Sequence, residues 1–222
     1  MVVLCRHQLV RLNEAGWAAV QANVWDDTAR DCLAHWSALH LPLVVTRQRA
    51  GLTDDQIALG LPAPLQWQRR RLALHVALRG VSYFDEFPGA AAVTSLLPAA
   101  ARNAWLNLLT ALAAVGAAPR VYGSFGWQRI TGLPYLHAGS DLDLRVSVSD
   151  AAMADAVAAA MHAPAFATPR LDGEIVFPDG SAVAWREWRA WRERRVDRVL
   201  VKRLRAVVME TDDAWLGEQQ PC

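Results

Sequence analysis

The stretch VYGSFGWQRITGLPYLHAGSDLDLRV, residues Val121–Val146, combines a glycine–serine pair with two closely spaced aspartates. Gly123 and Ser124 follow a short apolar run, and Asp141 comes 17 residues after Ser124. Asp143 follows two positions later, so that two carboxylates share a small volume. Such carboxylates repel each other unless a cation lies between them. The stretch therefore predicts a ligand site with a bound metal ion.

Residues Ser140–Ser149 show the clearest pattern in the chain, because polar and apolar side chains alternate there. This period of two predicts a half-buried strand, with Asp141 and Asp143 on its polar face about 6.5 Å apart along the chain. The residues before it predict, in order, a strand at Arg120–Tyr122, a helix at Phe125–Thr131 that ends at Gly132, and a loop at Pro134–Gly139.

The chemistry of these residue types indicates phosphoryl transfer. Mg²⁺ prefers oxygen ligands and retains bound phosphates, so it suits Asp141 and Asp143. Gly123 lets the backbone approach a ligand closely, and Ser124 adds a hydroxyl where the following helix exposes free N–H groups. An Asp-x-Asp pair alone is common on half-exposed strands, but the order strand, Gly-Ser, helix, loop and Asp-x-Asp strand is far more specific.

This order resembles the nucleotidyltransferase superfamily of the polymerase-β type. A closer resemblance is to the malonate decarboxylase holo-acyl-carrier-protein synthases, also called phosphoribosyl-dephospho-CoA transferases. The similar elements are Tyr122–Ser124, Trp127–Gln128, Thr131–Leu136, Ser140–Leu144, the later block DGEIVFPDGSAVAWREW (Asp172–Trp188) and, more loosely, PLVVTRQ (Pro42–Gln48). The chain departs from the family pattern at Gln8, where an aspartate is expected, and at Thr46, where an arginine is usual.

The resemblance implies a specific reaction. The family moves a phosphoribosyl-dephospho-CoA group from triphosphoribosyl-dephospho-CoA to a serine of the acyl carrier subunit of malonate decarboxylase, and pyrophosphate is released. Carried over, Asp141 and Asp143 are the catalytic residues and bind Mg²⁺. Gly123 and Ser124 bind the phosphates of the substrate.

A third carboxylate is expected from a neighbouring strand, because sites of this superfamily often use one. On the predicted strand Leu171–Phe177, Asp172 and Glu174 share a face. We choose Glu174 as the third metal ligand because it lies deeper in the strand, and Asp172 remains the alternative, as does a role for both as solvated hairpin residues. Lys202 is a further candidate for substrate binding.

The rest of the chain predicts an α+β protein with two parts. Residues 1–95 form a smaller N-terminal α/β module, and residues 96–222 form a nucleotidyltransferase-like catalytic domain with a mixed sheet and helices. Beyond the elements above, the patterns predict strands at Leu9–Leu12, Leu43–Thr46 and Arg71–Leu78, a loop at Leu52–Pro64, helices at Asp27–Leu39, Ala99–Val115 and from Asp150 to Met161, a hairpin of Leu171–Phe177 with Ser181–Trp185, and a long basic helix at Glu187–Met209.

Composition excludes several classes of protein. The net charge of +1 gives no general attraction for nucleic acid or an acidic membrane, and no apolar run is long enough to span a bilayer. The start, MVVLCRHQLVRL, carries charges within a short apolar run, so it is no secretory signal, and we expect a cytoplasmic protein. Two rival functions remain: an ATP-dependent nucleotidyltransferase acting on a protein or small molecule, and a carrier-protein-binding module without catalytic activity.

Overall fold

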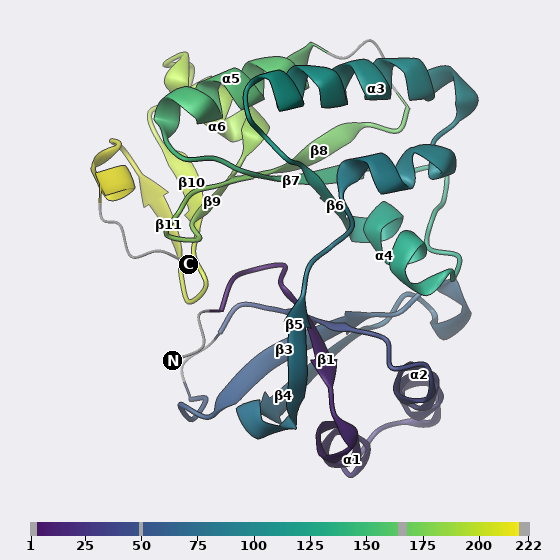
Figure 1. Cartoon of the computed structure of the whole chain (residues 1–222). Helices are drawn as coiled ribbons and strands as arrows, with labels where there is room; N and C mark the ends of the chain where they lie inside the picture. The colour runs from purple at the N-terminus through teal and green to yellow at the C-terminus, as the bar shows by residue number, and fades with distance from the viewer. Residues whose placement is uncertain (1–3, 49–50, 164–167, 218–222) are drawn as a thin grey trace.

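Two β-sheets, one from each half of the chain, organise the fold (Figure 1). The computed structural model describes residues 4–48, 51–163 and 168–217. The first sheet and its helices form the lower half of Figure 1, and the second sheet with its helices forms the upper half. The protein is therefore an α+β protein, as the sequence predicts.

The first sheet is entirely antiparallel, with strands in the order β4-β3-β2-β1-β5. Its strands are β1 (Leu9–Leu12), β2 (Leu43–Val45), β3 (Gln56–Pro62), β4 (Arg71–Ala77) and β5 (Val81–Asp85). The helices α1 (Glu14–Gln21) and α2 (Asp27–Ala38) contribute Trp17, Leu33 and Trp36 to its core. Alternating buried and exposed residues along β4 show that one face packs inward and the other is open to solvent.

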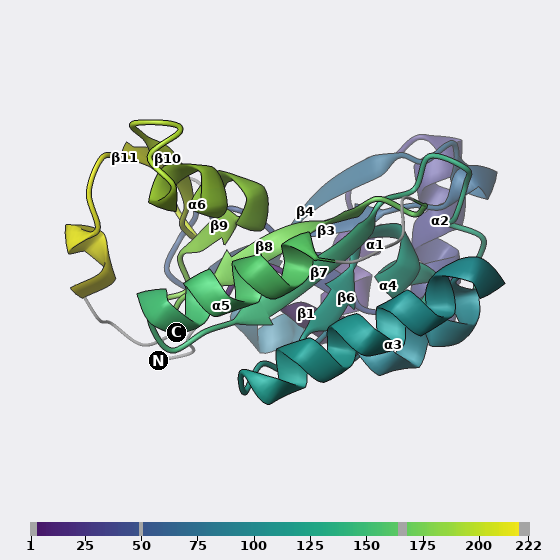
Figure 2. The same ribbon diagram turned by 90° about the horizontal axis from the view of Figure 1, so that it is seen from above.

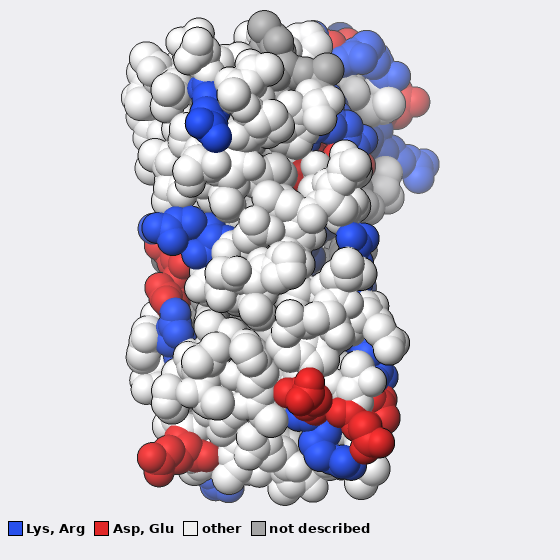
Figure 3. Space-filling model, turned by 90° about the vertical axis from the view of Figure 1, so that its right-hand side faces the viewer, with Lys and Arg blue, Asp and Glu red and all other residues white. Residues whose placement is uncertain are grey.

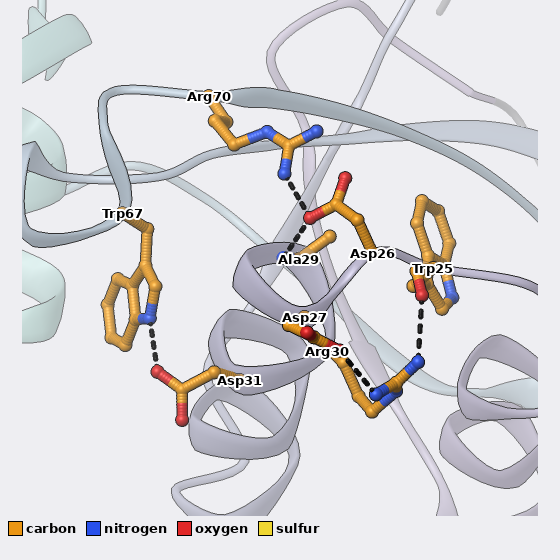
Figure 4. A network of polar contacts seen from close by, with 8 residues as sticks. All are labelled: Trp25, Asp26, Asp27, Ala29, Arg30, Asp31, Trp67 and Arg70. Carbon is orange, nitrogen blue, oxygen red and sulfur yellow. Dashed lines mark hydrogen bonds and ion pairs between the residues drawn. The ribbon is translucent and has the colours of Figure 1, made fainter.

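A network of polar contacts fixes the start of α2 (Figure 4). Asp26 accepts a hydrogen bond from the N–H of Ala29 at 3.0 Å and also forms an ion pair with Arg70, which immediately precedes β4. The Trp67 indole donates to Asp31 at 2.7 Å. These contacts satisfy a free N–H of the helix and tie α2 to the segment between β3 and β4.

The second sheet is mixed, with strands in the order β11-β10-β9-β8-β7-β6. Only β7 and β8 run parallel. The strands are β6 (Arg120–Tyr122), β7 (Leu142–Ser147), β8 (Leu171–Val176), β9 (Ala182–Ala184), β10 (Val199–Lys202) and β11 (Val207–Glu210). The helices are α3 (Ala99–Ala114), α4 (Gly123–Thr131), α5 (Ala151–His162) and α6 (Trp185–Arg192), and short 3₁₀ turns occur at Leu65–Trp67, Leu78–Gly80, Ala90–Leu96 and Ala214–Gly217.

The helices α3, α5 and α6 cover one face of this sheet, as Figures 1 and 2 show from two directions. Leu142, Leu144 and Val146 of β7 point into the core beneath them and are fully buried. Alternation along the strand then directs Asp143 and Arg145 to the opposite face, which lies toward the first half of the molecule. The fold thus places the polar face of β7 between the two sheets.

The parallel pairing of β7 and β8 depends on a glycine. Gly173 lies opposite Leu144 and has a φ of +137°. A Cβ atom at this position would lie 2.0 Å from the Leu144 carbonyl oxygen, so no larger residue fits without shifting the strands. This close approach holds Asp172 of β8 directly beside Asp143 of β7 in the sheet.

The two halves are packed together and share side chains. Phe87, Trp127 and Tyr135 lie in the core of the first sheet although they come after its last strand. The Tyr135 hydroxyl donates to the Pro62 carbonyl at 2.7 Å, and the N–H of Gln48 donates to the Leu204 carbonyl at 2.9 Å. The motif between Gly123 and Asp141 therefore also joins the two halves.

Most of the predicted elements are confirmed. The strands at Leu9–Leu12 and Arg120–Tyr122 have the predicted bounds, and α4 ends at Gly132, which has a φ of +71°. Asp150 caps α5 by accepting from the N–H of Met153 at 2.8 Å, as expected for a helix that begins there. The first sheet ends at Asp85, and Ala90 and Val93 belong to the core of the second half.

Two predicted elements are wrong. Residues 52–64 are not a loop, because β3 occupies Gln56–Pro62 between β4 and β2 in the first sheet. Gly60 lies within this strand and Pro62 at its end. The long helix at residues 187–209 does not form. The helix α6 stops at Arg192, Arg194 has a φ of +56°, and the chain returns as β10 and β11. Val199 and Val201 are buried two residues apart, a strand pattern that the density of arginines concealed.

On the face shown in Figure 3, charged side chains lie in small groups, several of which contain both signs, and wide uncharged areas lie between the groups. None of the helices in the described parts of the chain has both the length and the apolar character that a bilayer crossing requires.

Candidate active site

The two predicted metal-binding aspartates lie at the start of β7, on its polar face. Asp143 is the second residue of the strand, and Asp141 immediately precedes it. Asp143 pairs with Tyr122 of β6 on one side and with Asp172 of β8 on the other. The structure therefore brings Asp141, Asp143 and Asp172 together at one edge of the sheet.

The glycine of the Gly-Ser pair lies against Asp143. Gly123 begins α4 with a φ of +63°, and a Cβ atom there would lie 2.0 Å from Asp143 Oδ2. No side chain caps the start of α4, so the first N–H groups of the helix are available to an anion beside the aspartate. The structure thus places Gly123, with Ser124 next to it in the chain, against Asp143, and the binding roles assigned to these residues remain predictions.

An arginine that the sequence analysis did not single out neutralises part of this group. Arg170, just before β8, donates from Nε to Asp141 Oδ1 at 3.0 Å and from Nη2 to Asp141 Oδ2 at 2.5 Å. The same Nη2 donates to Asp172 at 3.2 Å. The hydrogen bond from Arg170 lowers the pKa of Asp141 below its usual value. No signal in the sequence marks Arg170, because its contact with Asp141 depends on the parallel pairing of β7 with β8.

Asp143 has an unusual ionisation. Burial, followed by the negative charges of Asp172 and Asp141, raises its pKa from the usual 3.8 to about 7. A carboxyl of this kind is half protonated near neutral pH and gains most from a nearby cation. The electrostatics of the site therefore favour a positive charge next to Asp143.

Glu174 lies deeper than the aspartates and is surrounded by basic side chains. It is 4% exposed, and its Oε1 accepts from Lys202 Nζ at 2.6 Å. Arg6 Nη2 lies 3.5 Å from Oε1, and His7 Nε2 lies 3.3 Å from Oε2. Burial alone would raise the pKa of Glu174, but His7 and then Lys202 outweigh it and lower the pKa to about 2.

The Glu174 cluster joins three distant segments of the chain. Arg6 and His7 come from the residues before β1, Glu174 from β8 and Lys202 from β10. His7 also packs against the Tyr122 ring, with centroids 4.4 Å apart. Arg6 and His7 therefore lie against the sheet near the aspartates, a position that their sequence did not reveal.

Other motif residues organise the loop before the aspartates. Gln128 Oε1 accepts from the N–H groups of Tyr135 and Leu136, both at 3.0 Å. His137 Nδ1 accepts from the N–H of Gly139, and the Ser140 hydroxyl accepts from the N–H of His137. These contacts hold the turn that delivers Asp141 to the edge of the sheet, so this part of the motif is structural.

The carboxylates of the site are the candidate ligands for a metal ion. Among the described residues, no three histidine, cysteine, aspartate or glutamate side chains are arranged to coordinate one ion. The Arg170 guanidinium nevertheless bridges Asp141 and Asp172 and so marks a place for positive charge. Two aspartates and the oxygens of a phosphate are a donor set that suits Mg²⁺, which seldom binds to protein ligands alone.

Together, the fold and the site define a two-part α+β protein with carboxylates beside a helix N-terminus. Comparison with known proteins then identifies the family. The family model described as the phosphoribosyl-dephospho-CoA transferase MdcG N-terminal domain matches residues 5–87, and that of the MdcG C-terminal domain matches residues 64–213. No solved structure gives a significant match.

Curated relatives agree with the family models. A phosphoribosyl-dephospho-CoA transferase of Xanthomonas campestris pv. campestris (strain 8004) is 34% identical over 89% of this chain and 90% of its own. That of Xanthomonas axonopodis pv. citri (strain 306) is 37% identical over 89% of this chain and 89% of its own. That of Bradyrhizobium diazoefficiens (strain USDA 110) is 36% identical over 92% of this chain and 88% of its own. The chain belongs to the phosphoribosyl-dephospho-CoA transferase family and is an enzyme of the transferase class.

Proposed function

We propose that this enzyme transfers the phosphoribosyl-dephospho-CoA group from 2'-(5''-triphosphoribosyl)-3'-dephospho-CoA to a serine of the acyl carrier subunit of malonate decarboxylase. The family supports the transferred group. The observation that supports the chemistry is the contact between the start of α4 and Asp143, because it sets a phosphate-binding helix N-terminus beside a carboxylate. We place the reaction in the cytoplasm, where the sequence predicts the protein to be.

In the proposed reaction the serine oxygen of the carrier attacks the α-phosphorus of the donor. The bond between the serine oxygen and phosphorus forms, the bond from the α-phosphorus to the bridging oxygen breaks, and pyrophosphate leaves with the bonding electrons. The amides at Gly123 and Ser124 would bind the departing phosphates, and an Oδ atom of Asp143 would accept the serine proton.

Mg²⁺ is part of this proposal. Asp141 and Asp143 would hold the ion, which when bound supplies positive charge that neutralises the phosphates. For the third carboxylate, the contacts favour Asp172 over Glu174. Asp172 lies beside Asp143 in the sheet, whereas Glu174 is buried and already paired with Lys202. Arg170 would have to release Asp141 and Asp172 when the ion binds.

Mass measurement of the carrier tests the function. Apo carrier subunit is mixed with the enzyme, Mg²⁺ and the triphosphoribosyl donor, and a parallel sample receives ATP instead. We expect a mass gain equal to the full prosthetic group with the donor alone. A gain only with ATP would indicate the rival nucleotidyltransferase, and no gain in either sample would overturn the proposal.

Variants assign the residues. We expect Asp143→Asn to reduce transfer at least 100-fold and leave carrier binding intact, whereas Asp54→Asn, an exposed aspartate of the first half, leaves both unchanged. Asp172→Asn is expected to reduce transfer more than Glu174→Gln once each variant is compared at equal folded concentration. The reverse order would restore Glu174 as the third ligand.

A further inference from the structure

A small cavity with several charged residues in its walls lies close to the aspartates. It has a volume of about 80 Å³, and its walls include Arg6, His7, Glu86, Phe87, Arg120 and Arg145. Arg145 is two residues beyond Asp143 on the same face of β7, so this wall lies about 6.5 Å along the strand from the aspartate. The cavity is therefore a neighbour of the proposed catalytic site and distinct from it.

The charges around this cavity are unbalanced. Three arginines face it, whereas Glu86 is the one carboxylate in its walls, and Glu86 is paired with Arg120. Arg120 also donates a hydrogen bond from Nη1 to the Phe87 carbonyl oxygen at 2.7 Å. Within the described residues Arg145 forms no ion pair, although Glu86 and Glu174 act on it from a greater distance, and its hydrogen bond to Ser147 is long, at 3.5 Å.

Arg6 adds a group whose hydrogen-bonding capacity is only partly used. Its Nη2 lies 3.5 Å from Glu174, and its Nε is buried without a hydrogen-bond partner among the described residues. Guanidinium groups that are half-buried and close together repel one another, and a compact anion would remove this repulsion. Their planar donors match the oxygens of phosphate.

We propose that this cavity binds one phosphate group, held by Arg6, Arg120 and Arg145. Its volume is far below that of the pockets that accept a nucleobase, so it takes the phosphate and leaves the remainder of a larger ligand outside. The inference rests on the proposed function only for the source of the phosphate. That source is either the diphosphate within the dephospho-CoA part of the donor or the triphosphate end that leaves as pyrophosphate.

Calorimetric titration of the whole protein with inorganic pyrophosphate tests the site. EDTA is present so that no metal ion at the aspartates contributes. We expect Arg145→Gln to weaken binding at least tenfold and Arg145→Lys to weaken it less. The matched control Arg71→Gln, an exposed arginine at the edge of the first sheet, is expected to bind within twofold of the unaltered protein. Binding unchanged by Arg145→Gln, or weakened instead by Ser124→Ala, would overturn the proposal.

Two further measurements keep the test decisive. Thermal unfolding establishes that Arg145→Gln is folded; if it is not, Arg6→Gln in the segment before β1 replaces it, with the same loss expected. Competition by dephospho-CoA would assign the site to the diphosphate of that group, and lack of competition would assign it to the triphosphate end. If the enzyme binds pyrophosphate through Arg145 but transfers nothing to the carrier, the cavity is established and the proposed function fails.

Discussion

At the scale of single residues, the site combines groups with opposite electrostatic tendencies. Asp143 is held near other carboxylates and its pKa rises to about 7, while Glu174, two residues from the partner of Asp143 in the sheet, is held near cations and its pKa falls to about 2. The difference arises from neighbours, since both side chains are largely buried. This difference is the reason for proposing a catalytic role for Asp143 and a structural role for Glu174.

The first prediction concerns Asp143 and pH. Its folded pKa of about 7 lies above the ordinary value of 3.8, so the stability that it contributes is present below pH 4 and is lost as pH rises through 7. Without metal, Asp143→Asn should therefore raise the melting temperature at pH 8 by about 3–6 °C and change it little at pH 4. Calorimetry in EDTA at both pH values measures this. A variant that melts lower at pH 8 would contradict the assigned repulsion.

The second prediction concerns Gly123. Replacement by alanine places a Cβ atom against Asp143 Oδ2 at a positive φ, so we expect a loss of about 1–3 kcal/mol in the free energy of unfolding and loss of transfer. Urea denaturation measures the first effect. Gly139→Ala is a suitable control, because the nearest atoms to its Cβ would be those of His137 at 3.5 Å. Equal losses in both variants would contradict the role of the close contact.

At the scale of elements, side chains cap the starts of α1, α2 and α5, and backbone fit fixes the pairing of β7 with β8. Asn13 caps α1 by accepting from the N–H of Gly16 at 2.9 Å, and its amide donates to the Arg79 carbonyl at 2.9 Å. One side chain thus joins α1 to the turn before β5. On the other sheet, Gly173 allows β8 to approach β7 closely enough to align Asp172 with Asp143.

The third prediction follows from this cap. Asn13→Ala removes both hydrogen bonds and should lower the free energy of unfolding by about 1–2 kcal/mol. Asn107→Ala is the matched control, since Asn107 is exposed within α3 and alanine favours a helix interior; we expect no loss there. Urea denaturation of both variants at pH 7 distinguishes them. Similar effects of the two substitutions would contradict a capping role for Asn13.

At the scale of the whole molecule, the two halves meet around buried polar groups as well as apolar ones. Lys202 of β10, and Arg6 and His7 of the segment before β1, contact Glu174 of β8. Removing one partner of such a pair leaves a buried charge uncompensated, which costs more than removing both. The stability of the interface should therefore depend on Glu174 and its cations as a unit.

The fourth prediction tests this unit. Lys202→Met should destabilise the protein by about 2–4 kcal/mol at pH 7, because Glu174 loses its closest cation. Adding Glu174→Gln should recover part of that loss, since the amide carries no charge. A double-mutant cycle by chemical denaturation measures the coupling. Additive effects of the two substitutions would show that Lys202 and Glu174 act separately.

The sequence by itself determined the α+β class, the strand with Asp141 and Asp143 on one face, and the Gly-Ser turn upstream, because periodicity and turn residues are local properties of the chain. It missed β3 and the strands after Arg192, where proline, glycine and arginine outweighed a weak strand pattern. Only the tertiary structure decided that Arg170 bridges two aspartates and that Arg6 and His7 reach Glu174. These contacts join residues far apart in the chain, and the pairing of strands and the docking of the two halves create them.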